Sequence, residues 1–194
     1  MLFSLGLLGG LTSLLGLLFV VSVHEFSHAL VGNLLGDRTA KLSGRLTLNP
    51  LAHLDWFGFL SLIFFGFGWG KPVPFNPLNL RNPRRDAALI SLAGPVSNLI
   101  LAAFFSLVFH FSDLGFFVGL AYLSLGLAVF NLLPLYPLDG FRIVFGFLPN
   151  FLAIDWLQME AFGPFLLIFL LLSGSLGKII SPLVALFSQA IFLP

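Results

Sequence analysis

Five apolar stretches of helical length constrain what this chain can fold into. They are separated by short polar segments and lie at about residues 3–35, 87–111, 114–133, 157–173 and 178–193. A helix crosses a bilayer with about 20 apolar residues, and the chain as a whole is 58% hydrophobic and only 9% charged. A soluble domain carries about 25% charged residues. The sequence therefore predicts an all-α polytopic membrane protein, and it excludes a soluble globule and a disordered chain.

Charge and cysteine content narrow the function classes further. The net charge of +1 gives no basic field for nucleic acid, and the lack of cysteine excludes a disulfide scaffold. The first apolar stretch begins without a basic region and runs to residue 35, which is too long for the apolar part of a signal peptide. We therefore expect this stretch to be a genuine span, with the lipid bilayer around it.

A sixth apolar segment, residues 56–70, is short and rich in glycine. As a helix it would reach about 22 Å, against a hydrocarbon core of about 30 Å. The flanking segments 37–55 and 71–86 hold seven of the nine basic residues, and basic residues collect on the cytoplasmic side of a membrane. We therefore expect 56–70 to dip into the membrane and return. The chain would have five or six transmembrane helices, with small β-strand or hairpin segments at the membrane surface, where polar and apolar residues alternate from Lys41 to Leu48.

The first span carries ionisable side chains, which are costly in a membrane. His24 and His28 are four residues apart, so in a helix both rings project from one face and can bind a single metal ion. Glu25 follows His24 directly, close enough to polarise a water molecule at that metal. The alternative is a pair of buried histidines satisfied by backbone carbonyls. Three ionisable groups on one helical turn favour the metal site.

A catalytic zinc site takes three protein ligands and leaves one position open, so a third ligand must come from elsewhere. Asp139 is the favoured candidate because Pro134 and Pro137 break the helix before it, which lets the carboxylate turn inward. Zinc, one aspartate and one hydroxide also sum to zero charge, which lowers the cost of burial. The alternative is an ordinary Asp–Gly turn at the interface. The competing ligand candidates are His53, Asp55, His110 and Asp113.

Several other polar residues have two interpretations each. Asn98 lies inside a span and Asn131 precedes the two prolines. Either side chain could hold an unwound substrate backbone or an oxyanion, or could join two helices, as polar residues do in membranes. His53 could hydrogen-bond a backbone carbonyl or approach the metal as a gate, and the structural role is favoured. His110 and Asp113 are expected to reach an interface.

Three motifs follow one another along the chain. They are His24-Glu25-x-x-His28, Gly94-Pro95-x-x-Asn98 and Asn131-x-x-Pro134-x-x-Pro137-x-Asp139-Gly140. Together they resemble the site-2 protease family of intramembrane zinc metalloproteases. Residues 44–53 and 71–77 resemble the short bacterial and archaeal branch of that family, which lacks PDZ and CBS domains. The resemblance implies the following roles: zinc ligands at His24, His28 and Asp139, the catalytic acid and base at Glu25, and active-site supports at Asn98 and Asn131.

The resemblance covers about residues 15–145. It implies a single membrane-embedded metalloprotease domain over residues 1–194, with the catalytic core at 15–145 and C-terminal transmembrane helices at 146–194. It also implies one Zn²⁺ per chain, and a site within the bilayer of a multi-pass cell-membrane protein that opens toward the cytoplasmic side. The expected partner is a membrane-protein substrate, cut within or near its transmembrane helix.

Two other function classes bury similar groups. A membrane metal transporter would need further ligands spaced along a pathway through several spans, whereas these ligands collect at one depth. A non-cleaving protein that binds membrane helices would be expected to lose Glu25 or a ligand, and all four residues are present. We therefore expect a zinc metalloendopeptidase in which Glu25 is the general base.

Overall fold

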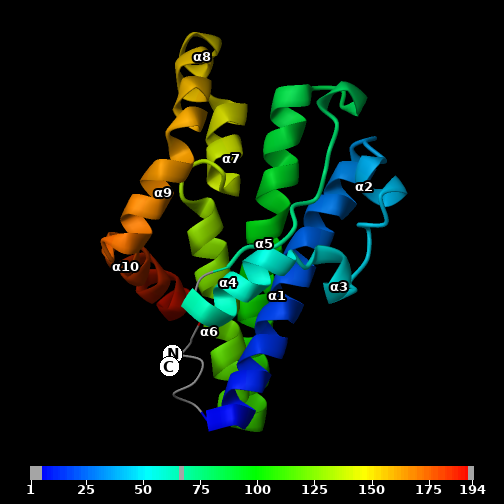
Figure 1. Cartoon of the computed structure of the whole chain (residues 1–194). Coiled ribbons are helices and arrows are strands. Elements are labelled where there is room, and N and C mark those ends of the chain that lie inside the picture. The colour runs from blue at the N-terminus through cyan, green and yellow to red at the C-terminus, as the bar shows by residue number, and fades with distance from the viewer. Residues whose placement is uncertain (1–5, 66–67, 192–194) are drawn as a thin grey trace.

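Helices make up nearly all of the regular structure in the computed structural model, which describes residues 6–65 and 68–191 (Figure 1). In chain order they are α1 (Gly6–Leu34), α2 (Thr39–Leu42), α3 (Pro50–His53), α4 (Trp56–Phe65), α5 (Pro83–Ser112), α6 (Gly115–Leu132), α7 (Asp139–Phe147), α8 (Asn150–Gln158), α9 (Gly163–Leu172) and α10 (Ser175–Ala190). Two 3-10 turns, η2 (Pro77–Asn79) and η3 (Met159–Ala161), lie between them. The predicted all-α class is confirmed for these residues.

Three helices, α1, α5 and α6, are long and apolar enough to cross a membrane, and they match three of the predicted stretches. α8 and α9 qualify only as a pair, with a 57° bend between them. The bend arises because Pro164, in the first turn of α9, has no N–H to continue the helix from η3. α10 has 16 residues and reaches only about 24 Å. The prediction of five or six spans is not confirmed: the described residues contain three candidates, or up to four if the bent pair is one span.

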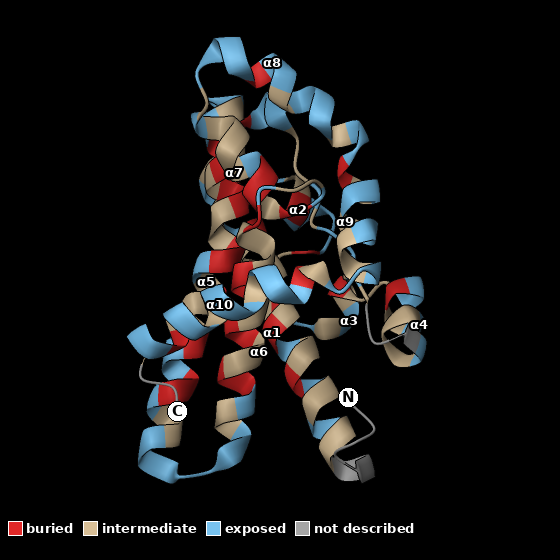
Figure 2. Ribbon diagram, turned by 90° about the vertical axis from the view of Figure 1, so that its left-hand side faces the viewer, coloured by how far each residue is buried: buried red, intermediate tan, exposed pale blue. Residues whose placement is uncertain are grey.

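α5 lies at the centre of the bundle and packs against α1, α6 and α7. Figure 2 shows buried residues concentrated along α5 and α6. Small side chains line these contacts, among them Ala29 of α1, Ala88 and Ala102 of α5 and Ala121 of α6, all with no exposed surface. Small residues allow helix backbones to approach closely, which is how helices associate in a membrane. This close approach brings the middle of α5 against the histidine face of α1.

The polar segment after α1 forms two short helices where strands were predicted. α2 begins behind Asp37, whose carboxylate accepts hydrogen bonds from the N–H and the hydroxyl of Thr39. α3 begins behind Asn49, whose side chain accepts from the N–H of Leu51. The Asp37 bond forms a local turn ahead of the N-cap residue Arg38, and Asn49 is itself the N-cap of α3. Both turns outweigh the polar–apolar alternation of the segment. The predicted β-hairpins are therefore wrong here, and one isolated bridge is the only strand pairing in the part of the chain that the structure describes.

α4 leaves the bundle and returns to it at one point. Leu54 before the helix and Gly70 after it form the isolated antiparallel bridge, and the N–H of Lys71 donates to the carbonyl of His53 at 2.8 Å. The helix has only 10 residues, about 15 Å. The chain therefore leaves the bundle after Leu54 and returns to it at Gly70, next to the point where it left. The re-entrant course of 56–70 stays a prediction, and residues 66 and 67 lie outside the described part of the chain.

Asp37 joins the end of α1 to the segment before α5. Its buried carboxylate accepts hydrogen bonds from Thr39, from the N–H of Asn76 at 2.7 Å and from the side-chain amide of Asn79 at 2.8 Å. Burial raises the pKa of Asp37, but these hydrogen bonds favour the charged form and hold its pKa below the ordinary value. Asp37 therefore stabilises the folded chain as an anion.

We expect Asp37→Asn to lower the stability of the folded protein by roughly 2 kcal/mol at neutral pH, because the new NH2 group faces donors. A lowered folded-state pKa adds stability above the unfolded value of about 3.9, and this stability is lost as the pH falls through the folded-state pKa. The difference in melting temperature between wild type and Asp37→Asn should therefore shrink below about pH 4. Thermal unfolding in detergent at pH 3 to 7 measures this. The exposed Asp113→Asn is the control, and a difference that stays constant over this pH range would contradict the prediction.

Candidate active site

Three predicted ligand residues meet in the centre of the bundle. His24 and His28 lie one turn apart on α1, with their Nε2 atoms 3.0 Å apart. Asp139 is the first residue of α7, and its Oδ2 atom lies 3.1 Å from His24 Nε2 and 3.2 Å from His28 Nε2. Both imidazoles are buried, and Asp139 is mostly buried. Within the described part of the chain, these residues form the one group of three that could hold a metal ion.

The geometry of this triangle fits zinc. Its edges are 3.0 to 3.2 Å, and the ligands of tetrahedral zinc at 2.0–2.1 Å lie about 3.3 Å apart. Asp139 Oδ2 is buried without a hydrogen-bond donor. Lone pairs this close repel one another unless a metal ion lies among them or an imidazole N–H donates to the carboxylate. Two imidazole nitrogens and one carboxylate oxygen form a donor set typical of catalytic zinc.

α5 orients both imidazoles from behind. His28 Nδ1 donates to the carbonyl of Ile90 at 2.6 Å, which leaves the lone pair of His28 on Nε2, facing Asp139. The side-chain amide of Asn98, which has no exposed surface, lies 3.0 Å from His24 Nδ1. The amide atom nearest this ring nitrogen is Asn98 Nδ2, and the contact fixes the orientation of the His24 ring. Asn98 therefore contacts a ligand residue, and it does not line the cavity described below.

Gly94 allows α5 to come this close. A Cβ at Gly94 would lie 2.6 Å from His24 Nε2 and closer still to His28 Nε2. The next residue, Pro95, lies inside α5 and cannot donate to the preceding turn. The Gly94-Pro95 pair thus allows α5 to pack against the two candidate ligand histidines, a role that the motif alone did not reveal.

The link between α6 and α7 presents Asp139 to the two histidines. Gly140 packs against the backbone carbonyls of Leu132 and Leu133, where a Cβ would collide with both. Next in the chain, the carbonyl of Phe141 accepts a hydrogen bond from the Trp156 indole N–H at 3.0 Å. The rings of Phe141 and Trp156 stack with their centroids 5.1 Å apart. Trp156 has no signal in the sequence, because its contact with Phe141 joins two helices that no local pattern relates.

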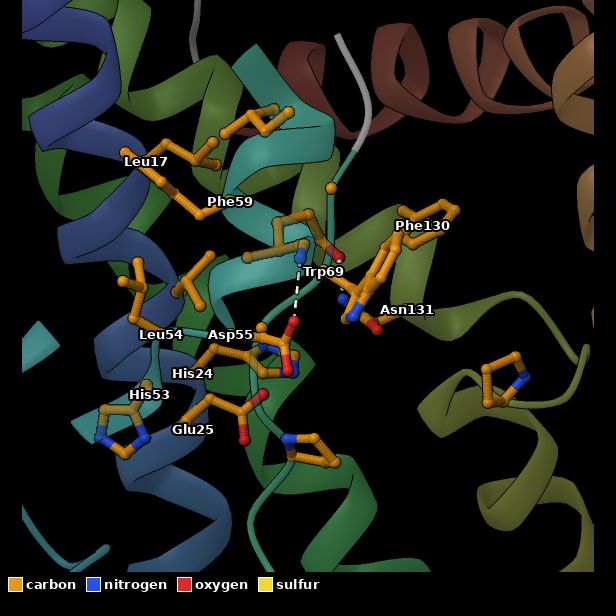
Figure 3. Close-up of a pocket in the computed structure, with 18 of the residues that line it drawn as sticks. Leu17, His24, Glu25, His53, Leu54, Asp55, Phe59, Trp69, Phe130 and Asn131 are labelled. Atoms are coloured by element: carbon orange, nitrogen blue, oxygen red, sulfur yellow. Dashed lines mark hydrogen bonds between the residues drawn. The ribbon is translucent and has the colours of Figure 1, made fainter. Parts of the chain in front are cut away.

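Glu25 lies beside His24 on the wall of an apolar cavity of about 560 Å³ (Figure 3). The half-buried Glu25 carboxylate accepts a hydrogen bond from the N–H of Val73 at 3.1 Å. α1, α4, the end of α6 and α9 contribute most of the cavity wall, with side chains such as Leu17, Phe59 and Phe130. His24 and Glu25 therefore face a mostly apolar cavity.

The remaining predicted residues lie apart from the metal triangle. Asn131 lines the cavity and donates from Nδ2 to the carbonyl of Leu127 in its own helix at 3.0 Å. His53 is buried and lines the cavity, with Nε2 2.8 Å from the carbonyl of Thr47, a contact of the kind that the structural role predicts.

Three competing ligand candidates are also accounted for. Asp55 caps α4 by accepting the N–H of Gly58 at 2.8 Å. His110 and Asp113 are exposed at the far end of α5. None of them joins the group that could hold a metal.

Comparison with known proteins places this site in a family. The chain is 44% identical over 170 residues to "Putative zinc metalloprotease YwhC" of Bacillus subtilis (strain 168), an alignment that covers 79% of this chain and 78% of the relative. The chain belongs to this zinc metalloprotease family. It is also 34% identical over 138 residues to "Putative zinc metalloprotease Rip2" of Mycolicibacterium smegmatis, and over 139 residues to Rip2 of Mycobacterium tuberculosis H37Rv. These alignments cover 65% of this metalloprotease and 53% of each Rip2 protein. No family model matches the chain, and no solved structure gives a significant match.

We expect Gly94→Ala to weaken zinc binding at least about tenfold, because the methyl group would displace the two histidines. Zinc titration with a competing chelator, in detergent, measures the affinity. Gly126→Ala is the matched control, because a Cβ at Gly126 of α6 meets nothing within 4 Å. Equal zinc affinity in both variants would contradict this account of Gly94.

Proposed function

We propose that the chain is an intramembrane zinc metalloprotease of the site-2 type, in the short branch without PDZ and CBS domains. It would hydrolyse peptide bonds within or near the transmembrane helices of membrane-protein substrates. One observation carries the proposal: a three-ligand cluster and a carboxylate lie beside an apolar cavity, among helices long enough to cross a membrane. Membership in a zinc metalloprotease family supports the same chemistry.

His24, His28 and Asp139 would hold one zinc ion per chain. Zinc bound there supplies a Lewis acid that activates water and polarises the scissile carbonyl. Glu25 takes the proton from the attacking water as the new C–O bond forms. It then donates that proton to the amine nitrogen as the C–N bond breaks, so the base is restored.

The cavity suits an unwound segment of a membrane protein. A substrate helix protects its carbonyls with internal hydrogen bonds, so it must unwind before attack, and unwound backbone needs polar partners inside a membrane. Asn131 is the cavity residue that we assign to this support, whereas Asn98 would act by orienting His24. The apolar walls would accept apolar substrate side chains.

The proposed location is the cell membrane, with a multi-pass chain and a site that opens toward the cytoplasm. The basic segments 37–55 and 71–86 support this orientation. The bridge between Leu54 and Gly70 holds the end of the first segment beside the start of the second, so both are expected on the cytoplasmic side. A membrane metal transporter is less well supported. It needs a series of ligand clusters, and the described residues hold one such group.

We expect Glu25→Gln to retain about one zinc per chain and to lose cleavage by on the order of a thousandfold. The two measurements are zinc content and proteolysis, on purified protein reconstituted with a panel of single-span substrates. Glu160→Gln, in η3 and outside the cavity lining, is the matched control. Cleavage by wild type and by Glu25→Gln at the same rate would overturn Glu25 as the base, and loss of zinc from both would overturn the metal centre.

We also expect zinc to stabilise the folded chain. Zinc at 100 times its dissociation constant should add about 2.7 kcal/mol, because only the folded chain assembles the three ligands. Removal of zinc with a chelator should lower the melting temperature in detergent, and added zinc should restore it. Asp139→Ala should abolish this shift. A shift of equal size in Asp139→Ala would show that zinc binds elsewhere.

A further inference from the structure

We infer that residues 71–79 form a backbone clamp that orients the Glu25 carboxylate, with Arg45 and Asp37 as positioning residues at its two ends. The inference rests on the proposed function, in which Glu25 is the base. The clamp contains the η2 turn and otherwise no regular secondary structure. Its conformation therefore depends on side chains elsewhere that bind its backbone.

The contact between the clamp and Glu25 is a single backbone hydrogen bond. The N–H of Val73 donates to Glu25 Oε2 at 3.1 Å. Val73 lies between Pro72 and Pro74, and proline has no N–H. The three residues 72–74 therefore offer one donor, and it points at the base. With Oε2 held in this way, Oε1 is the oxygen assigned to the proton transfer.

Arg45 fixes the clamp just before Val73. Its buried guanidinium donates to the carbonyls of Lys71 at 3.3 Å and Pro72 at 3.1 Å, and to the carbonyl of Ala52. A buried arginine is costly unless its donors are satisfied. Here they are satisfied by backbone oxygens, two of which immediately precede Val73. The planar guanidinium sets their positions, which a flexible lysine would not do.

Asp37 fixes the clamp after Val73. It accepts the N–H of Asn76 at 2.7 Å and the side-chain amide of Asn79 at 2.8 Å. Asp37 is also buried, with 1% of its surface exposed. Two buried charges of opposite sign thus hold the two ends of one irregular segment. Between these ends, the hydrogen bond from Val73 reaches the catalytic carboxylate.

The first test is amide hydrogen exchange of Val73 in the full-length protein in detergent. Because 72–74 contain one N–H, this amide reports directly on the clamp. We expect its exchange to become at least about tenfold faster in Glu25→Ala, Arg45→Lys and Asp37→Asn than in wild type. The amide of Asp113, bonded to the carbonyl of Phe109 at the far end of α5, is the internal control. Exchange of Val73 at one rate in all four proteins would overturn the clamp.

The second test compares Val73→Pro with Val73→Ala. Val73→Pro deletes the N–H in a segment that already contains Pro72 and Pro74, whereas Val73→Ala removes the side chain and retains the N–H, so the comparison separates the N–H from the side chain. We expect kcat of Val73→Pro to be at least about tenfold below that of Val73→Ala, with the same KM and zinc content. Equal kcat values would overturn the clamp, and so would a difference confined to KM.

Failure of the clamp differs from failure of the proposed function. If wild type cleaves, Glu25→Gln does not, and the two Val73 variants are equal, only the clamp is wrong. If wild type and Glu25→Gln do not differ in cleavage, the base assignment is wrong. Hydrogen exchange still tests the contact with Glu25 in that case, because it requires no catalysis.

Discussion

The structure depends on holding three lone-pair atoms about 3 Å apart in an apolar bundle. Lone pairs on His24 Nε2, His28 Nε2 and Asp139 Oδ2 repel one another unless a metal ion lies among them or an imidazole N–H donates to the carboxylate. Each imidazole must also present the right tautomer, so its other nitrogen needs a fixed partner. α5 provides both partners, through the Ile90 carbonyl and the Asn98 amide. Small residues between α1 and α5 keep these contacts short, since a larger side chain would separate each imidazole of α1 from its partner on α5.

In an apolar bundle, the polar N–H and carbonyl groups of irregular backbone also need hydrogen-bond partners from buried side chains. Membranes tolerate irregular backbone where protein buries it or where it lines a cavity. Arg45 and Asp37 do this around the cavity. Arg84 does it at the N-terminal end of α5, where its guanidinium donates to the carbonyl of Phe145 at 2.6 Å, to that of Leu148 and to the side chain of Asn150. Basic residues in these segments therefore also serve to bind backbone.

The proposed chemistry depends on both the three-atom cluster and the irregular backbone around the cavity. Glu25 and His24 lie side by side on the wall of a cavity whose other walls come from elements far apart in the sequence, including α4 and α9. α4 is held at its ends by the Leu54–Gly70 pairing, and α9 packs on α10 and η3. Two elements with few neighbours thus border the space in which a substrate segment would unwind, while α1 and α7, both packed against α5, carry the three candidate ligands.

The sequence by itself determined the three long helices and the pairing of His24 with His28, because apolar length and helical period are local properties. It also indicated Asp139, since proline-broken backbone beside a buried carboxylate is unusual in a span. Only the tertiary structure decided the rest. The bend at Pro164 reduced the number of candidate spans, and the turn formed by Asp37 and Thr39 leads into a short helix where a strand was predicted. Asn98 was ambiguous because an amide has the same sequence signal whether it contacts a substrate or a ligand. The N–H of Val73 gave no signal, since every residue except proline has one, and only packing decides where it points.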